Sequence, residues 1–429
     1  MIGATLCRRA AACALALLIA VPVARAQQAV DRSTLSHKLV MGYQGWFGCP
    51  KDGAGAGWNH WFDGHTPTID MLPDVSELSP EERCDTGLFT ADHKPIFVFS
   101  SRDPATVRRH FAWMRQYGID GVAVGRFGVA IEDPASRSAV DQVLDNVRQA
   151  AEAEGRLFFV EYDLSGMQST DLALVAADWQ RLQNGGLTGS PAYARHRGRP
   201  VLGVWGLGFG GRELRPEAAA RLMAALRAEG APRGGVTLLG GVPAGWRTDS
   251  ADADPDPAWG AVYRSLDIIS PWAVGRFGDD AGADNFLRER IRPDLLETRR
   301  LGIDYMPVVF PGFSWKNLMD LREPAKHARI NEIPRRCGRF YWHQVSDAVA
   351  AGVTMLFGAM FDEVDEGTAM FKMLPSHAQS PAEASFLTLD ADGCRLPSDW
   401  YLRLAGAAQQ LLDGAIRPSP ELPIPLPKQ

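Results

Sequence analysis

The stretch of sequence at residues 354–361 reads TMLFGAMF and is apolar over nearly its whole length. A strand with one wet face would alternate apolar and polar residues. The continuous run therefore indicates a strand buried on both faces, as strands of parallel sheets are. Residues 362–366 follow at once and read DEVDE, with four carboxylates in five positions. This pairing predicts a parallel sheet with clustered acids at the carboxyl end of one strand.

Seven more short apolar runs precede this segment. They lie at residues 39–42, 121–125, 157–162, 201–205, 236–240, 268–271 and 305–310. Helical stretches lie between most of them. One begins at Asp103-Pro104, with Asp as the N-cap and Pro in the first turn. The others cover 136–154, 216–230, where Gly230 ends the helix, and 400–412.

Eight buried strands that alternate with helices predict an α/β fold, a (β/α)8 TIM barrel, in which the last helix packs beside the first strand. An open doubly wound sheet is the alternative. The chain has 429 residues, whereas such barrels commonly need about 250. We expect the excess in long βα-loop insertions. The largest of these is 46–94, and the apolar run 96–101 forms a rim strand of this insertion.

The N-terminal residues have the pattern of an export signal. Arg8 and Arg9 precede an apolar run, and residues 23–26 read VARA, which suits signal peptidase. The run is short for a membrane span. We therefore expect a signal peptide at 1–26, an N-terminal extension at 27–37, one catalytic domain at 38–414 and a Pro-rich, extended or disordered tail at 415–429. The predicted location is secreted or periplasmic.

Four cysteines lie outside the signal, and an even number in an exported chain predicts two disulfides. Three pairings are possible, and proximity in the sequence favours Cys49 with Cys84 and Cys337 with Cys394. The net charge of −6, with no long basic run, argues against a nucleic-acid partner. The chain has twelve Trp and eight Tyr residues, and many of the Trp residues lie in predicted loops. Loop Trp side chains suit the apolar faces of sugar rings.

In a (β/α)8 barrel the active site lies at the carboxyl ends of the strands. Nearly every predicted strand end carries an aromatic or ionisable residue, and two more candidates lie in the large insertion. The candidate substrate-binding residues are Tyr43, Trp46, Trp58, His60, Arg126, Glu161, Trp205, Trp246, Trp272, Trp315 and Asp362.

Crowded carboxylates at a barrel mouth have raised and divergent pKa values. Glycoside hydrolysis uses one protonated and one ionised carboxyl group, so Glu363 and Glu366 are the predicted catalytic pair. A solvated acidic loop or a calcium site is the alternative for this cluster. A metal site at His60, Asp63 and His65 is a weaker candidate.

The segment 360–368, MFDEVDEGT, resembles the end of the barrel in glycoside hydrolase family 99, the endo-α-mannosidases. Supporting likenesses lie at 42–48, 100–104, 118–122 and 159–162. The likeness spans about residues 38–372 and suggests the loosely defined group between families 71 and 99.

The resemblance implies that Glu363 assists the sugar 2-hydroxyl and that Glu366 is the general acid/base. It also implies that Glu161 holds a substrate hydroxyl and that Tyr43 contacts the reacting sugar. Val364-Asp365 replaces the aromatic-His pair of family 99, and Arg126-Phe127 stands where that family has Trp. These departures leave open the identity of the sugar in the substrate and whether hydrolysis retains or inverts the anomeric configuration.

The sequence thus predicts a secreted glycoside hydrolase that uses the pair Glu363 and Glu366 and is expected to be endo-acting on an α-linked, α-mannan-like or α-glucan-like polysaccharide or oligosaccharide. No cofactor or metal is expected, and the expected partner is a polysaccharide or oligosaccharide. The alternatives are a non-catalytic carbohydrate-binding barrel and a calcium-dependent hydrolase that uses Asp362 and Asp365. Linkage, endo or exo action and oligomeric state stay open.

Overall fold

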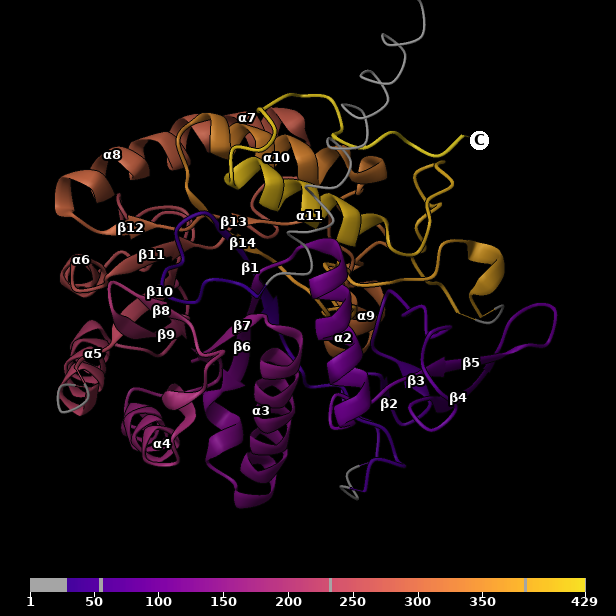
Figure 1. The fold of residues 1–429 in the computed structure, drawn as a ribbon, viewed down its shortest axis with the longest axis horizontal. Helices are drawn as coiled ribbons and strands as arrows, with labels where there is room; N and C mark the ends of the chain where they lie inside the picture. The colour runs from indigo at the N-terminus through magenta and orange to yellow at the C-terminus, as the bar shows by residue number, and fades with distance from the viewer. Residues whose placement is uncertain (1–28, 54–56, 231–233, 382–383, 429) are drawn as a thin grey trace, which may run out of the picture.

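Parallel strands form a closed ring at the centre of the molecule (Figure 1). The structure, a computed structural model, describes residues 29–53, 57–230, 234–381 and 384–428. The strands of the ring are β1 (Lys38–Tyr43), β6 (Gly121–Phe127), β7 (Leu157–Asp163), β9 (Arg199–Trp205), β10 (Thr237–Val242), β11 (Ile268–Pro271), β12 (Asp304–Tyr305), β13 (Val308–Val309) and β14 (Met355–Gly358). They are hydrogen-bonded in the order β12-β11-β10-β9-β7-β6-β1-β14-β13.

The ring closes because β12 and β13 are two parts of one strand position. β12 pairs with β11, and β13 pairs with β14. Between them, the Met306 amide donates to the carbonyl of Ile269 at 2.9 Å, and the Phe357 amide donates to the carbonyl of Pro307 at 3.1 Å. Pro307 has no N–H to donate, so the ladder is interrupted there. The predicted (β/α)8 barrel is confirmed, and the open-sheet alternative is wrong.

Helices surround this ring and follow the strands in sequence (Figure 1). They are α2 (Pro104–Tyr117), α3 (Pro134–Glu154), α4 (Leu172–Asn184), α5 (Pro216–Gly230), α6 (Trp259–Arg264), α7 (Asp280–Phe286), α8 (Arg292–Leu301), α9 (Lys316–Arg322), α10 (Arg339–Ala350) and α11 (Trp400–Leu412). A π-helical turn at Leu287–Ile291 joins α7 to α8. Short 3₁₀ turns lie at Gly128–Ile131, Leu187–Gly189, Pro324–Lys326, Arg336–Gly338 and His377–Gln379.

The predicted helix starts agree with the structure where capping residues mark them. The Asp103 carboxylate accepts hydrogen bonds from the amides of Ala105 and Thr106, so it caps α2 as expected. α5 and α11 have the predicted bounds. α3 begins two residues earlier than predicted, because Asp133 caps it and Pro134 fills the first position.

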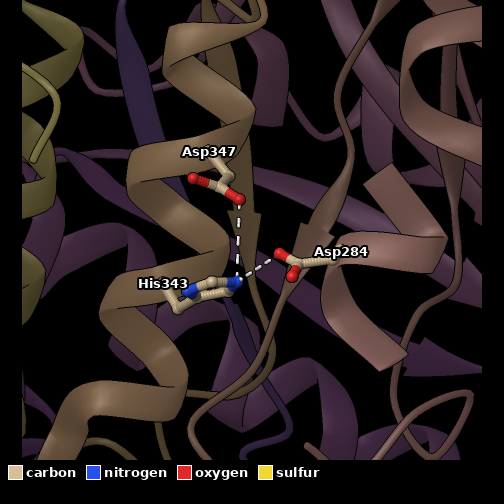
Figure 2. Close-up of side chains that lie close together, drawn as sticks. All are labelled: Asp284, His343 and Asp347. Carbon is tan, nitrogen blue, oxygen red and sulfur yellow. Dashed lines mark hydrogen bonds and ion pairs between the residues drawn. The ribbon is translucent and has the colours of Figure 1, made fainter. Parts of the chain in front are cut away.

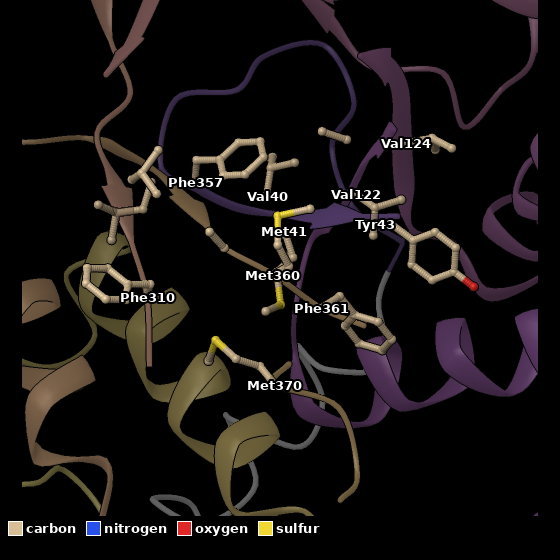
Figure 3. Packing of buried hydrophobic residues seen from close by; sticks show 14 of the residues in the cluster. Val40, Met41, Tyr43, Val122, Val124, Phe310, Phe357, Met360, Phe361 and Met370 are labelled. Atoms are coloured by element: carbon tan, nitrogen blue, oxygen red, sulfur yellow. The ribbon is translucent and has the colours of Figure 1, made fainter. Parts of the chain in front are cut away.

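Apolar side chains fill the space beneath the carboxyl ends of β1 and β14 (Figure 3). Met41, Phe310, Phe357, Met360 and Met370 are among the buried side chains gathered there. Gly42 on β1 is required for this packing, because a Cβ at this position would lie 2.1 Å from Cε of Met360. The polar groups of the following loop therefore rest on a dry, closely packed floor.

The large insertion after β1 folds onto the barrel beside α9 (Figure 1). It contains β2 (Phe62–Asp63), β3 (Thr66–Pro67), β4 (Cys84–Phe89) and β5 (Pro95–Val98). β5 pairs antiparallel with β4, which confirms a rim strand near 96–101. A further short strand, β8 (Arg195–His196), pairs antiparallel with β9 and was not expected. The favoured disulfide pairings, Cys49–Cys84 and Cys337–Cys394, are both present.

The predicted signal peptide at 1–26 lies outside the described residues. The Pro-rich tail contains no helix or strand over residues 415–428, and it contacts the barrel. The Trp342 Nε1 group donates to the carbonyl of Ser419 at 2.9 Å. Ile416, Leu422 and Ile424 also pack against the core. Within the described ranges, no helix combines the length and the apolar character that crossing a membrane requires.

Removing the Cys49–Cys84 bridge with the double substitution Cys49→Ser and Cys84→Ser is expected to lower the free energy of unfolding by about 3–4 kcal/mol. The bridge spans 35 residues of chain, and a closed loop of that size loses roughly this much denatured-state entropy. Urea unfolding of the oxidised wild type and the variant measures the difference. Equal unfolding free energies would show that the Cys49–Cys84 bridge does not stabilise the folded protein.

Candidate active site

A cavity of about 700 Å³ opens at the carboxyl ends of the barrel strands. Its wall contains several acids, aromatic rings and arginines contributed by distant parts of the chain. The acids are Glu161, Asp163, Glu363, Asp365 and Glu366. The rings are Trp46, Phe47, His60, Phe127, Trp205 and Trp272, and the arginines are Arg102, Arg212 and Arg322. This location is where the fold predicts an active site.

The loop that carries the predicted catalytic pair is anchored through Asp362. The two oxygens of this fully buried carboxylate accept hydrogen bonds from the backbone amides of Gln44 and Gly45, each at 2.8 Å. Asp362 therefore joins the end of β14 to the end of β1. Asp362 is fully buried and does not line the cavity. The structure therefore places this predicted substrate contact in the support of the loop.

Backbone carbonyls hold the rest of the same loop. The Val364 carbonyl accepts from the amides of Asp70 and Met71, at 3.1 and 3.2 Å. The Glu366 carbonyl accepts from the amide of Ser314 at 2.9 Å. Beneath the loop, the buried Arg335 donates through Nη2 to the carbonyls of Gly367 and Ala369, each at 2.7 Å. These contacts fix the loop before any ligand binds.

Glu363 lies in the cavity wall and is held by two side chains. Its Oε1 accepts from Nε2 of Gln44 at 3.1 Å, and its Oε2 accepts from the Thr368 hydroxyl at 3.1 Å. Burial raises the pKa of Glu363 well above its usual range, and the neighbouring charges of Glu366 and Asp365 raise it further. The two hydrogen bonds act in the opposite direction, because they favour the ionised form.

Glu366 has a different environment from Glu363. No described residue donates a hydrogen bond to its carboxyl group, which lines the cavity and is partly exposed there. Burial and the charge of Asp365 raise the pKa of Glu366 to about 7. A carboxyl group with this pKa is largely protonated in mildly acidic solution and has a free path for its proton into the cavity.

Glu161 and Asp163 come from the same face of β7, since residues two apart on a strand point the same way. Glu161 is 8% exposed, and no described residue hydrogen-bonds its carboxyl group. Burial and then the charge of Asp163 raise the pKa of Glu161 to about 8. Gly203 on β9 makes room for this side chain, because a Cβ there would lie 2.8 Å from Cβ of Glu161.

Trp205 and Trp272 form an aromatic corner of the cavity. Their ring centroids are 5.3 Å apart, and the rings meet edge to face at 76°. The guanidinium of Arg212 lies over the Trp205 ring at 4.7 Å, and Arg212 also donates to the Ser165 hydroxyl. Trp46 is different, because His60 stacks on its ring at 3.9 Å and Phe127 lies 5.1 Å away. Trp46 is therefore part of the wall rather than a free platform for a sugar.

Two expected substrate contacts, Tyr43 and Arg126, point away from the cavity. Tyr43 is fully buried, and its hydroxyl lies 3.0 Å from Nδ1 of His110 on α2. Arg126 is buried in ion pairs with Asp178 and Asp141. Alternation along a strand explains both positions, since the side chains adjacent to cavity-facing ones must face the helices.

Trp246 is 2% exposed and donates through Nε1 to Asp294 at 2.9 Å. Trp58 packs on Phe62 inside the insertion. Trp315 donates to Glu332 and lies beneath the amino group of Lys326. None of these three rings lines the cavity. Tyr43, Arg126 and Asp362 are likewise outside its wall, so the structure does not bring these six predicted contacts to the cavity.

Several residues of the site are absent from the candidate substrate-binding residues that the sequence predicts. Gln44 and Asp163 line the cavity, and Thr368, which is fully buried, donates to Glu363. All three lie close to predicted site residues in the sequence, so the strand-end argument could have included them. Arg212 and Arg322 lie in loop and helix segments with no motif, and the sequence contains no signal for them. Asp365 was considered only as a calcium ligand.

A possible metal-ligand group lies elsewhere, on the outer helices α7 and α10 (Figure 2). Nε2 of His343 is 2.8 Å from Asp284 and 3.6 Å from Asp347. In the described ranges this is the group whose ligand atoms lie close enough to hold an ion. His60, Asp63 and His65 do not form such a group, because His60 contacts Asp365 instead.

The fold resembles that of known glycoside hydrolases. Two structures of the GH99 endo-α-mannosidase from Bacteroides thetaiotaomicron, one with bis-tris-propane, superpose with TM-scores of 0.61 and 0.59. Each is 16% identical in sequence and covers 89% of this chain and 99% of its own. The sequence matches no protein-family model and no curated protein. The likeness in fold to family 99, expected from the sequence, is confirmed.

Replacing Glu161 with Gln is expected to stabilise the protein at pH 8 and to have little effect near pH 4.5. The folded-state pKa of Glu161, about 8, exceeds that of an unfolded Glu, so the native state binds the extra proton. Stability is then lost as pH rises between these two values, and Gln removes that loss. An unsatisfied buried group of this kind costs about 1–3 kcal/mol.

Urea unfolding at pH 4.5 and pH 8 measures the effect, and Glu213→Gln, at an exposed position, is the matched control. A difference between Glu161→Gln and wild type that does not change with pH would show that Glu161 is not held protonated by the fold.

Proposed function

We propose that the protein is a glycoside hydrolase that cleaves an α-linked polysaccharide or oligosaccharide in the barrel cavity. The observation that carries this proposal is the pair Glu363 and Glu366, which share one cavity and both have raised pKa values. Each carboxylate raises the cost of ionising its neighbour, so the pair favours a state that holds one proton. One acid and one base on the same site are what glycosidic cleavage requires.

The different environments of the two groups support different roles. Glu366 has no protein hydrogen bond to its carboxyl group and a pKa of about 7, so it is suited to protonate the leaving glycosidic oxygen and then to activate water. Glu363 is held by Gln44 and Thr368, whose hydrogen bonds favour its ionised form against the burial that raises its pKa. The resemblance to family 99 assigns such a fixed carboxylate to the sugar 2-hydroxyl.

The cavity wall supports a carbohydrate substrate. Trp205 and Trp272 contribute aromatic surface to the wall, with Arg212 over the Trp205 ring, and Glu161, Asp163 and Arg212 offer donors and acceptors beside it. Apolar faces bordered by hydroxyls are the surface that a pyranose presents. The cavity is open at the barrel mouth and suits a chain that extends beyond it, in keeping with endo action.

Export agrees with this function. The predicted signal peptide and the disulfides Cys49–Cys84 and Cys337–Cys394 fit a secreted or periplasmic protein. The calcium-dependent alternative loses support, since Asp362 is fully buried outside the cavity wall whereas Asp365 lines the cavity. A non-catalytic sugar-binding barrel is the competing proposal and differs from an enzyme in not requiring both glutamates.

Glu363→Gln and Glu366→Gln are each expected to lower turnover by about a hundredfold to ten-thousandfold, the usual effect of losing a general acid or base. A screen of purified wild type against α-mannans and α-glucans identifies a cleaved glycan, and the rate on this glycan is then measured. Both variants should retain their fold and saccharide binding, with Glu213→Gln as the control. Near-wild-type turnover in either variant would remove that glutamate from the mechanism.

The wild-type rate is expected to fall as pH rises through about 7, where Glu366 loses the proton that it must donate. Asp365→Asn removes a negative charge that raises the pKa of Glu366, so this alkaline limb should move to lower pH. The exposed Asp63→Asn is the control and should leave the limb in place. An unchanged limb in Asp365→Asn would mean that another group determines it. The pH dependence of kcat on the cleaved glycan is the measurement.

A further inference from the structure

His60 reaches the cavity from the insertion in an unusual backbone conformation. Its φ angle is +60°, in the left-handed region that a side chain with Cβ rarely adopts. The surrounding contacts hold it there. Its carbonyl accepts from the Thr68 hydroxyl at 2.6 Å, and its neighbour Asn59 is fixed by donating to the carbonyl of Trp46. Strained residues that the surroundings hold so firmly occur often at functional sites.

The imidazole of His60 has two fixed contacts. Its ring is parallel to that of Trp46 within 3°, with 3.9 Å between centroids. Its Nδ1 lies 3.0 Å from Oδ2 of Asp365. Asp365 stands between Glu363 and Glu366 in the sequence and is 3% exposed, and its Oδ1 has no hydrogen-bond partner among the described residues. The contact with His60 is thus the one that orients the Asp365 carboxylate.

An ionised carboxylate only accepts hydrogen bonds, so the Nδ1 that faces Asp365 must carry the proton. In a neutral imidazole the other nitrogen, Nε2, is then an acceptor with a free lone pair. No described residue contacts Nε2, the side chain is 26% exposed, and His60 lines the cavity. When the ring is neutral, the geometry therefore presents Nε2 as an acceptor to a group bound in the cavity.

We propose that Asp365 is a positioning residue that fixes the tautomer of His60, so that Nε2 accepts a hydrogen bond from a free hydroxyl of the bound saccharide. The proposal rests on the proposed function and adds a specificity element to it. A saccharide with an unsubstituted hydroxyl at this wall should bind, and one that is O-methylated there should not. Because Trp46 is covered by His60, this wall recognises a hydroxyl rather than the apolar face of a ring.

Nitrogen NMR of protein labelled with ¹⁵N-histidine tests the tautomer without any substrate. The chain has nine histidines, and His60→Gln assigns the signals of His60. The proposal expects a protonated Nδ1 and an unprotonated Nε2 in the wild type. In Asp365→Asn, whose amide can donate to Nδ1, the proton should move to Nε2. A wild-type spectrum with the proton on Nε2, or no change in Asp365→Asn, overturns the proposal.

Saccharide contact is tested by adding α-1,2-mannobiose and α-1,3-glucobiose, and then the O-methylated form of whichever binds. Binding should shift the His60 Nε2 signal, and His60→Phe, which keeps the stacking on Trp46, should weaken affinity about tenfold, as the loss of one hydrogen bond does. Asp365→Asn should weaken it similarly, and the double variant no further. The exposed His65→Gln is the control and should bind as wild type does.

The outcomes separate this proposal from the proposed function. A saccharide that binds the wild type but leaves both the His60 signals and the affinity of His60→Phe unchanged overturns the His60 contact alone. If the wild type binds neither saccharide, the proposed function fails and this contact fails with it. The tautomer result then still decides whether Asp365 positions His60. If Asp365→Asn does not fold, the two His60 variants provide the decisive comparison.

Discussion

The site depends on the carboxylate of Asp362, which joins the last strand of the barrel to the first. Its two oxygens accept hydrogen bonds from the amides of Gln44 and Gly45, so this group fixes the acidic loop after β14 to the end of β1. A buried carboxylate is costly unless such donors surround it. The two amides thus allow four acids to follow a buried strand, and they place Gln44 where it contacts Glu363.

The sequence predicted the barrel well because parallel strands and amphipathic helices have local signatures. Eight apolar runs matched eight strand positions, and caps such as Asp103 marked the helix starts. The strand-end rule also brought Glu161, Glu363 and Trp205 to one cavity. The rule failed where it ignored that successive side chains on a strand point to opposite faces of the sheet. Arg126 is adjacent to Phe127 on β6, and residues next to each other on a strand must face opposite sides.

Contacts that cross the insertion could not be predicted. His60 and Asp365 are 305 residues apart, and the insertion has no period that would place His60 near the acidic loop. The same holds for Asp70 and Met71, whose amides hold the Val364 carbonyl. Arg335 contacts the loop from below through backbone carbonyls, which any sequence offers equally. These residues determine the geometry of the site, although none belongs to a motif.

The interrupted seventh strand position gives the barrel a seam. β12 and β13 each contribute two residues, and Pro307 between them supplies no amide to the ladder. A barrel with continuous hydrogen bonding between all its strands resists local unfolding at every position. In this barrel the seventh strand position has fewer such hydrogen bonds than the others. In amide hydrogen exchange, protection should be lost along 304–309 before it is lost at β6 and β7, whose pairing runs over seven residues. The seam also lies far round the ring from β7, so Glu161 and Asp163 stand on the most firmly paired part of the barrel.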